Sequence, residues 1–455
     1  MILSWKETRS GVVNPDERLP WGQTIAMGFQ HVLAMFGATV VAPILMGFDP
    51  NLAILFSGIG TLIFFAFVGG AVPSYLGSSF AFIGPVAAVT ATAAASGAVN
   101  GIGLALGGIV AAGVVYTLIG VVVHLTGAGW IDSLMPPLVT GAVVAIIGLN
   151  LAPAARNLSA VDPVVAAITV LAIFIVGLLT TGVFSRLPIL IGSVIGYVAA
   201  LLLGGTSADG REYLGVTVHG VDLTQVGAAS WFGAPAFQTP EFNVSAMALI
   251  APVAIVLVAE NTGHVKAVSA LTGTNLTPYL GRAFIGDGVA TIVAGLRGGT
   301  GVTTYAENIG VMAVTRVYST LVFLIAGIIA IVFGLSPKFG AIIGSIPRGV
   351  LGGVTTVLFG LIAVTGARIW VDNRVDFTRT VNLFIAATTL IIGAADYTVT
   401  LGGFTLNGIT LGTFGAIVLY QLFKGAPDED DFAIVGDAAE ADAEIRAGAA
   451  GQSRR

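Results

Sequence analysis

The stretch GTGVTTYAENIGVMAVTR, Gly299 to Arg316, decides the fold. It places one carboxylate, Glu307, and one amide, Asn308, inside a chain that is otherwise strongly apolar. Glycines, threonines and a tyrosine precede Glu307, and an apolar run begins at Ile309. This order predicts extended backbone that leads into a short helix whose first turn carries the acid. We interpret the rest of the chain as the frame that holds this acid at membrane depth.

The composition indicates a membrane protein. Of the 455 residues, 9% are charged and 56% are hydrophobic, and the mean hydropathy is +0.95. A soluble globule cannot bury so much apolar surface, and windows of about 20 apolar residues recur along the chain. The fold class is therefore an all-α polytopic membrane protein, with no cleavable signal peptide expected in the polar residues 1–20. The absence of cysteine excludes disulfides, thiolate metal sites and thiol catalysis.

The apolar windows predict fourteen transmembrane segments on two sides of a polar extracytoplasmic loop at residues 205–244. The segments lie near 23–45, 51–71, 79–97, 101–126, 136–154, 161–182, 187–204, 245–263, 284–296, 304–315, 317–336, 347–366, 379–398 and 402–423. Residues 1–22 form the N-terminal segment and residues 424–455 an acidic tail. Most of the 19 lysines and arginines fall on the side of the two termini, which predicts that both termini are cytoplasmic.

The two halves, residues 23–204 and 245–423, resemble each other. Ser78-Ser79-Phe80 corresponds to Thr303-Thr304-Tyr305 at an offset of 225 residues, and Pro136, Val139 and Gly141 correspond to Pro347, Val350 and Gly352 at an offset of 211. Because each half holds an odd number of segments, the copies must have opposite topology. Inverted repeats with short, interrupted segments are typical of secondary transporters, which bind substrate near the midplane.

Glu260 and His264 form the first candidate site, because residues four apart share one helical face. A histidine beside a carboxylate can exchange a proton with it or hold it ionised. The alternative is a pair at the cytoplasmic end of the eighth segment that satisfies itself in headgroup water. The spacing E-x-x-x-H and the four histidines of the chain do not predict a metal site.

Glu307 is the second candidate. Thr304-x-x-Glu307 matches a capping box, so one alternative is a glutamate that only satisfies backbone N–H groups at a helix start. The functional alternative uses the free N–H donors and positive end of a half-helix beside a carboxylate acceptor. Together these groups suit a small planar ligand with alternating N–H and C=O groups, whereas Glu307 would repel an ordinary anion.

Other polar or aromatic side chains lie in apolar segments. Phe80 could stack on an aromatic ligand or serve in packing. His31, next to Gln30, could hold helices together as a buried hydrogen-bonding histidine or take part in binding or proton relay. Asp287 could anchor the ninth segment or join a polar network with Asn308 and these residues.

At Glu307 the sequence resembles a known family. ENIGVMAVTR (Glu307 to Arg316) is similar to the signature of the nucleobase-ascorbate transporter family, the nucleobase-cation symporters. The resemblance extends over QHVLAMFGATVVAP (Gln30 to Pro43), YLGSSFAFIGPV (Tyr75 to Val86), GWIDSLMPP (Gly129 to Pro137) and TTYAENIGVMAVTRVYST (Thr303 to Thr320). AENTGHVKAV and GFTLNGI resemble the pyrimidine-permease branch associated with the Rut uracil-degradation pathway, within the bacterial uracil permeases.

The resemblance implies a core domain of segments 1–4 and 8–11 and a gate domain of segments 5–7 and 12–14. It also implies short antiparallel strands in segments 3 and 10, with the base between them. Carried over, the substrate-binding residues are Glu260, Glu307, Phe80, Ala38, Tyr305 and Ala306, and His264 supports Glu260. From the residues themselves we expect Glu260 and His264 to couple the proton. A supporting polar network is expected from His31, Gln30, Asn308 and Asp287. Ala306 departs from the glycine common in uracil permeases, and Phe359 stands where related permeases can carry a tyrosine.

The expected function is therefore import of uracil or a related pyrimidine by proton symport, with the core moving like an elevator against the gate. The alternatives are a xanthine or purine permease of the same family and an anion exchanger of the same architecture. The resemblance implies a homodimer in the inner (plasma) membrane. No enzyme activity, cofactor, metal or nucleic-acid partner is expected.

Overall fold

The computed structural model describes residues 4–9, 11–95, 100–182, 184–206, 210–213, 215–401 and 404–426. Most of the acidic tail predicted at residues 424–455 lies outside the described residues. Residues 96–97 of the predicted third segment and 402–403 of the fourteenth also lie outside them.

Helices make up most of the described chain, with four short two-stranded sheets. The elements up to the polar loop are β1 (Lys6–Glu7), β2 (Glu17–Arg18), α1 (Trp21–Met46), α2 (Pro50–Val68), β3 (Leu76–Ser78), η1 (Phe80–Phe82), α3 (Ile83–Ala95), α4 (Gly101–Thr126), α5 (Gly129–Leu134), α6 (Pro137–Asn150), α7 (Ala152–Val161), α8 (Pro163–Leu179), η2 (Phe184–Arg186) and α9 (Pro188–Gly204). The loop holds β4 (Arg211–Tyr213), β5 (Val216–Val218) and α10 (Thr224–Ala228). The remaining elements are α11 (Val244–Ile250), α12 (Val253–Thr272), η3 (Thr277–Tyr279), α13 (Leu280–Gly295), β6 (Val302–Thr304), α14 (Ala306–Thr315), α15 (Thr320–Gly334), α16 (Pro337–Gly344), α17 (Arg348–Asp372), α18 (Thr380–Ala394), β7 (Val399–Leu401), β8 (Phe404–Leu406) and α19 (Gly408–Phe423).

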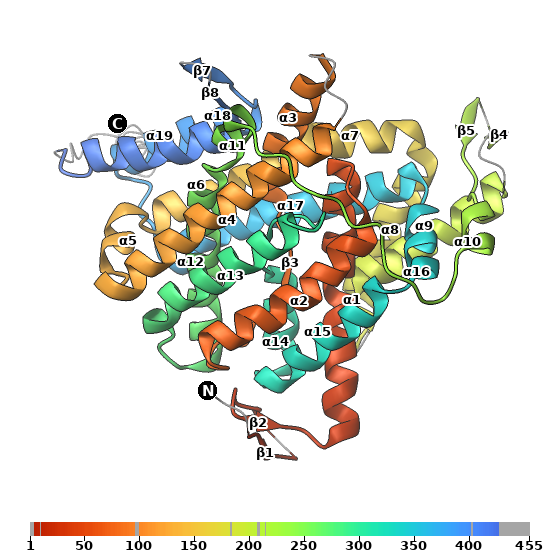
Figure 1. Cartoon of the computed structure of the whole chain (residues 1–455), viewed down its shortest axis with the longest axis horizontal. Coiled ribbons are helices and arrows are strands. Elements are labelled where there is room, and N and C mark those ends of the chain that lie inside the picture. Colours follow the sequence, from red (N-terminus) through yellow and green to blue (C-terminus); the bar gives the residue numbers. More distant parts are fainter. Residues whose placement is uncertain are drawn as a thin grey trace, which may run out of the picture.

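The pair of β3 and β6 joins the two halves of the chain. The strands are antiparallel, with Gly77 opposite Thr303, and β3 lies near the middle of the molecule, whereas the other strand pairs lie at its edges (Figure 1). Each strand leads into a helix, β3 into η1 and α3, and β6 into α14. Short antiparallel strands therefore occur before the half-helices, as the family resemblance implied.

The offset between these two motifs is 226 residues, not the 225 predicted. β3 begins at Leu76 and β6 at Val302, and the helices after them begin at Phe80 and Ala306. The backbone thus aligns Phe80 with Ala306, and Tyr305 with Ser79. Matching the two aromatic residues in the sequence moved the alignment by one position.

Threonines from neighbouring helices satisfy the outer edges of the two strands. Thr61 of α2 accepts a hydrogen bond from the Leu76 N–H at 3.0 Å. Thr291 of α13 accepts from the Val302 N–H and donates to the Val302 carbonyl, both at 3.2 Å. Extended backbone at membrane depth needs such partners, because hydrocarbon supplies none.

Within the described residues, six helices are long and apolar enough to cross a bilayer, or seven if the pair of α15 and α16, bent by 81°, is counted as one span. Several shorter apolar helices, such as α8, α9, α18 and α19, accompany them. The chain is accordingly a multi-pass membrane protein. Fourteen spans, inverted repeats and core and gate domains stay predictions.

Glycines allow long helices to pack closely. A Cβ at Gly113 of α4 would lie 2.9 Å from the carbonyl oxygen of Gly288 in α13. The same holds for α6 and α17, where a Cβ at Gly141 would lie 2.8 Å from the carbonyl oxygen of Gly366. Small residues at such crossings let helices approach where lipid supplies no hydrophobic drive for association.

Several segment boundaries differ from the predicted ones. α12 continues to Thr272, beyond the predicted end of segment eight at residue 263. The eleventh segment ends at Gly334, where the chain bends into α16. The fourteenth begins at Gly408, because the β7–β8 hairpin occupies the residues before it.

The N-terminal segment packs on the junction of α14 and α15. Val13 is fully buried, and its N–H donates to the Arg316 carbonyl at 3.0 Å while its own carbonyl accepts from the Tyr318 N–H at 2.8 Å. The Trp5 indole N–H donates to the Thr320 hydroxyl at 3.0 Å. This arm therefore holds the far end of the half-helix whose first turn carries Glu307.

Candidate functional site

Tyr305 joins three elements at the centre of the fold. Its hydroxyl donates to the Ser78 carbonyl of β3 at 2.8 Å and accepts from the Thr39 hydroxyl of α1 at 3.2 Å. A Cβ at Gly77 would meet the Tyr305 ring, so only glycine leaves room for it there. Ala38, the neighbour of Thr39, is also buried. The predicted backbone wall at Ala38, Tyr305 and Ala306 is thus built from α1 and the start of α14.

Glu307 lies in the first turn of α14, as predicted. The residue that precedes the helix is Tyr305, and the structure records no side-chain cap there within the described residues. Thr304 lies in β6, and its hydroxyl bonds to His264 and Asn261, so Thr304 does not cap α14 and the capping box does not form. Glu307 instead lines a cavity of about 280 Å³ that it shares with Arg186 and Gly310.

Glu260 and His264 share a second cavity, of about 320 Å³, which also borders α14, and Gly310 lines both cavities. Ala306 lines the same cavity, and Arg368 of α17 contributes to it. The Glu260 Oε2 atom is buried and has no hydrogen-bond partner among the described residues. α12 runs on to Thr272, so Glu260 and His264 lie within the helix and not at its last residue; whether the pair lies in headgroup water stays a prediction.

A chain of buried hydrogen bonds leads from His264 into the protein. His264 Nδ1 and the Thr304 hydroxyl lie 2.9 Å apart, and the Thr304 hydroxyl donates to Asn261 Oδ1 at 3.3 Å. The Asn261 amide donates to Asp287 Oδ2 and, at 2.9 Å, to the Tyr116 hydroxyl. Asp287 is fully buried and belongs to this polar network rather than acting alone on α13.

His31 and Asn308 tie α1 to α14. The Asn308 amide donates to the His31 carbonyl and to His31 Nδ1, both at 3.0 Å. The His31 ring is fully buried and packs on Phe323, with ring centroids 4.6 Å apart. Of the two roles considered for His31, this geometry favours holding helices together. Gln30 is buried beside it, and its Nε2 has no partner in the described part of the chain.

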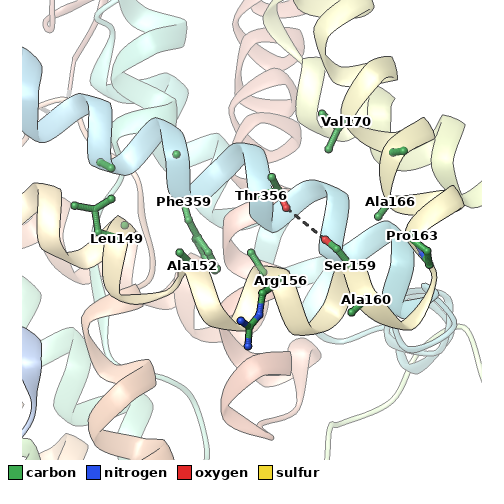
Figure 2. A pocket seen from close by; sticks show the side chains of 15 residues that line it. Leu149, Ala152, Arg156, Ser159, Ala160, Pro163, Ala166, Val170, Thr356 and Phe359 are labelled. Carbon is green, nitrogen blue, oxygen red and sulfur yellow. Dashed lines mark hydrogen bonds between the residues drawn. The ribbon is translucent and has the colours of Figure 1, made fainter. Parts of the chain in front are cut away.

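Phe80 packs edge-on against Phe359 of α17, with ring centroids 5.5 Å apart. Phe359 also lines a separate cavity of about 650 Å³ between α6, α7, α8 and α17 (Figure 2). That cavity is largely apolar, and its Ser159 and Thr356 hydroxyls hydrogen-bond to each other at 3.4 Å. None of the predicted site residues lines it, so the two cavities beside α14 are the better candidates for the site.

The sequence did not predict four polar side chains as members of this hydrogen-bonded site, although it suggested Thr304 as a helix cap. Thr39, Tyr116, Asn261 and Thr304 are all buried and hydrogen-bonded to one another or to predicted residues. The available signal was a hydroxyl or amide inside an apolar segment, which is costly in lipid without a partner. The partners come from other segments and are visible only in three dimensions.

The central strand pair, the half-helix that carries Glu307 and the several membrane-length helices define a polytopic membrane transporter. A solved structure supports this fold class. The transmembrane domain of the cyanobacterial bicarbonate transporter BicA aligns with a TM-score of 0.58 at 18% identity, covering 90% of this chain and 99% of that chain. At this identity the likeness shows the fold alone.

Residues 22–402 match the model of the Xan_ur_permease family, described as a permease family, and the chain belongs to this family. The "Putative pyrimidine permease RutG" of Escherichia coli (strain K12) is 59% identical over 425 residues, covering 93% of this chain and 94% of that protein. The "Uracil permease" of Paenibacillus larvae subsp. larvae is 39% identical over 429 residues, covering 91% and 97%. These relatives are permeases, so the chain is a transporter and not an enzyme.

Proposed function

We propose that this protein imports uracil or a closely related pyrimidine nucleobase by proton symport. The observation that carries the proposal is the arrangement around α14. Its first turn holds Glu307 beside one cavity, and Ala306 faces a second cavity together with Glu260 and His264. The names of the relatives, a pyrimidine permease and a uracil permease, support the choice of substrate.

The chemistry of the site suits a neutral base. Uracil is planar and carries two N–H donors and two carbonyl acceptors. Glu260 and Glu307 would accept the N–H groups, and the free backbone N–H groups at the start of α14 would donate to a carbonyl. Phe80, with its ring packed edge-on against Phe359, would close one side of the base. Ala38, Tyr305 and Ala306 would complete the wall.

Proton coupling would follow from the Glu260 and His264 pair. A buried carboxylate without a cation is costly, so a proton taken up with the base neutralises the site for movement through the membrane. The core would then move against the gate, and loss of the proton inside would release the base. In this scheme His31, Gln30, Asn308 and Asp287 support the pocket without touching the base.

The proposal extends to the architecture. Fourteen spans would form two inverted repeats at residues 23–204 and 245–423, separated by an extracytoplasmic loop at 205–244. Segments 1–4 and 8–11 would form the core, and segments 5–7 and 12–14 the gate. The protein would lie in the inner membrane as a homodimer, with residues 1–22 and 424–455 in the cytoplasm. The equal spacing of 226 residues between β3 and β6 and between the helices that follow supports the repeat.

Uptake of labelled uracil tests the assignment. Cells that lack their own uracil permease and express this protein should accumulate uracil, and Glu260→Gln and Glu307→Ala should abolish uptake while the protein still reaches the membrane. Uracil uptake at the wild-type rate in either variant would refute the proposed substrate site. Excess unlabelled xanthine should leave uracil uptake unchanged, and strong competition by xanthine would indicate a purine permease. Anion exchange catalysed by the protein would instead indicate an anion exchanger of the same architecture.

A matched control separates the site from general damage. Glu241 lies outside the two cavities in an exposed segment, where it accepts a hydrogen bond from the Asn100 amide. Glu241→Gln removes one negative charge, as Glu260→Gln does, and should leave uracil uptake near the wild-type rate.

A further inference from the structure

We propose that Thr304 is a positioning residue that determines which ring nitrogen of His264 carries the proton. It acts through a hydrogen bond to His264 Nδ1 and does not touch the base. The tautomer follows from the structure, and only its effect on proton coupling rests on the proposed function.

The direction of each hydrogen bond follows from the partners. The Tyr116 hydroxyl donates to the Leu257 carbonyl at 3.3 Å, so it must accept from the Asn261 amide nitrogen. The same nitrogen donates to the Asp287 carboxylate. Asn261 is thereby oriented with its oxygen, Oδ1, toward β6.

Asn261 Oδ1 can only accept a hydrogen bond, so the single hydroxyl proton of Thr304 points to it. The Thr304 oxygen is then left to accept, and its neighbour at 2.9 Å is His264 Nδ1. His264 must therefore donate from Nδ1–H. Nε2 is left as the ring nitrogen with a lone pair, on a side chain that lines the same cavity as Glu260.

This tautomer has a functional consequence. A histidine with a free Nε2 can take a proton from the cavity, whereas the opposite tautomer presents an N–H there and cannot. Ionisable groups near this region lie on five helices: Glu260 on α12, Tyr116 on α4, Asp287 on α13, Glu307 on α14, and Arg368 and Asp372 on α17. The side chains of Asp287, Asn261 and Thr304, which are linked by hydrogen bonds, are all buried. They can therefore hold the His264 tautomer without exchanging protons with water.

The variants Thr304→Val and Thr304→Ser test the proposal. Valine keeps the shape and removes the hydroxyl, whereas serine keeps the hydroxyl. Nitrogen-15 NMR of the purified full-length protein labelled at histidine reports the tautomer directly, and with only four histidines the His264 signal is assigned by its loss in His264→Asn. The wild type and Thr304→Ser should show Nδ1–H. Thr304→Val should shift the ratio about two- to tenfold toward Nε2–H, the range expected for one lost hydrogen bond.

The second readout is the pH dependence of the KM for uracil. Thr304→Val should change this pH profile, and Thr304→Ser should restore it. Tyr116→Phe removes the hydroxyl that accepts from Asn261 at the far end of this row of hydrogen bonds. It should shift the tautomer ratio in the same direction by a smaller factor, and it replaces Thr304→Val as the test variant if Thr304→Val does not fold. An Nε2–H tautomer in the wild type, or an unchanged tautomer in Thr304→Val, overturns the proposal. Because the NMR needs no transport, a protein that shows the tautomer but moves no uracil refutes the proposed function alone.

Discussion

Gly77→Ala perturbs the frame of the site at its tightest point. A Cβ at Gly77 would lie 2.7 Å from the Thr39 hydroxyl oxygen and closer still to the Tyr305 ring. Neither neighbour can yield freely, because Tyr305 is held by Ser78 and Thr39 and is only 3% exposed. Inserting a methyl group into such a packed position costs about 1–3 kcal/mol.

If that cost appeared fully as lost substrate binding, affinity would fall about 5- to 160-fold. The assay is binding of uracil to the purified protein by calorimetry, together with uptake in cells. The control is Gly415→Ala in α19, where a Cβ would meet no atom within 4 Å and where alanine favours the helix over glycine. Gly77→Ala with wild-type affinity and uptake would refute the inference that Tyr305 and β3 form the frame.

Three further predictions concern stability, each measured by thermal unfolding of the protein in detergent. Thr291→Val leaves the Val302 N–H of β6 without its partner at 3.2 Å and should lower the stability by about 1–3 kcal/mol. Thr92→Val, at an exposed position of α3, should leave the stability nearly unchanged. Equal losses of stability in the two variants would contradict the role of Thr291. Val13→Asp buries a charge where the side chain is 0% exposed and should destabilise the arm and α14 by about 2 kcal/mol or more, while Val12→Asp, 44% exposed, should not; matching melting temperatures would argue against a docked arm. The two carboxylate oxygens of Asp162 accept from the Val165 and His219 N–H groups at 3.1 and 3.0 Å, and Asp162→Asn replaces one of them with a donor. This variant should lose about 1.5–3 kcal/mol of stability. A melting temperature equal to that of Asp222→Asn would show that these hydrogen bonds do not stabilise the fold.

Hydrophobic runs and motif order predicted the elements that local sequence controls. The predicted fourth segment, 101–126, coincides with α4. The two short strands were implied by the family resemblance, and the structure contains them. The position of Glu307 in the first turn of α14 was likewise predicted from the glycines and threonines that precede it and the apolar run that follows it. In each case the signal lies within one continuous stretch of the chain.

Features that depend on contacts with residues far away in the sequence could not be predicted from the sequence. The predicted eighth segment ends at residue 263, but α12 continues to Thr272, and beyond residue 263 the Lys266 ammonium group pairs with Asp132 at 2.7 Å on the exposed surface. The Thr304 hydroxyl could equally have capped α14, and only the approach of α12 shows that it bonds to His264 and Asn261. The docking of Val13 on the α14–α15 junction has no sequence signal that we can identify.

The most direct test of the account is uracil accumulation in proteoliposomes with an imposed ion gradient. An inward proton gradient should drive accumulation of labelled uracil by the wild type, a protonophore should abolish it, and replacing sodium should have no effect. Glu260→Gln should not accumulate uracil under the same gradient. Accumulation that follows a sodium gradient, or that persists in Glu260→Gln, would contradict proton-coupled transport at this site.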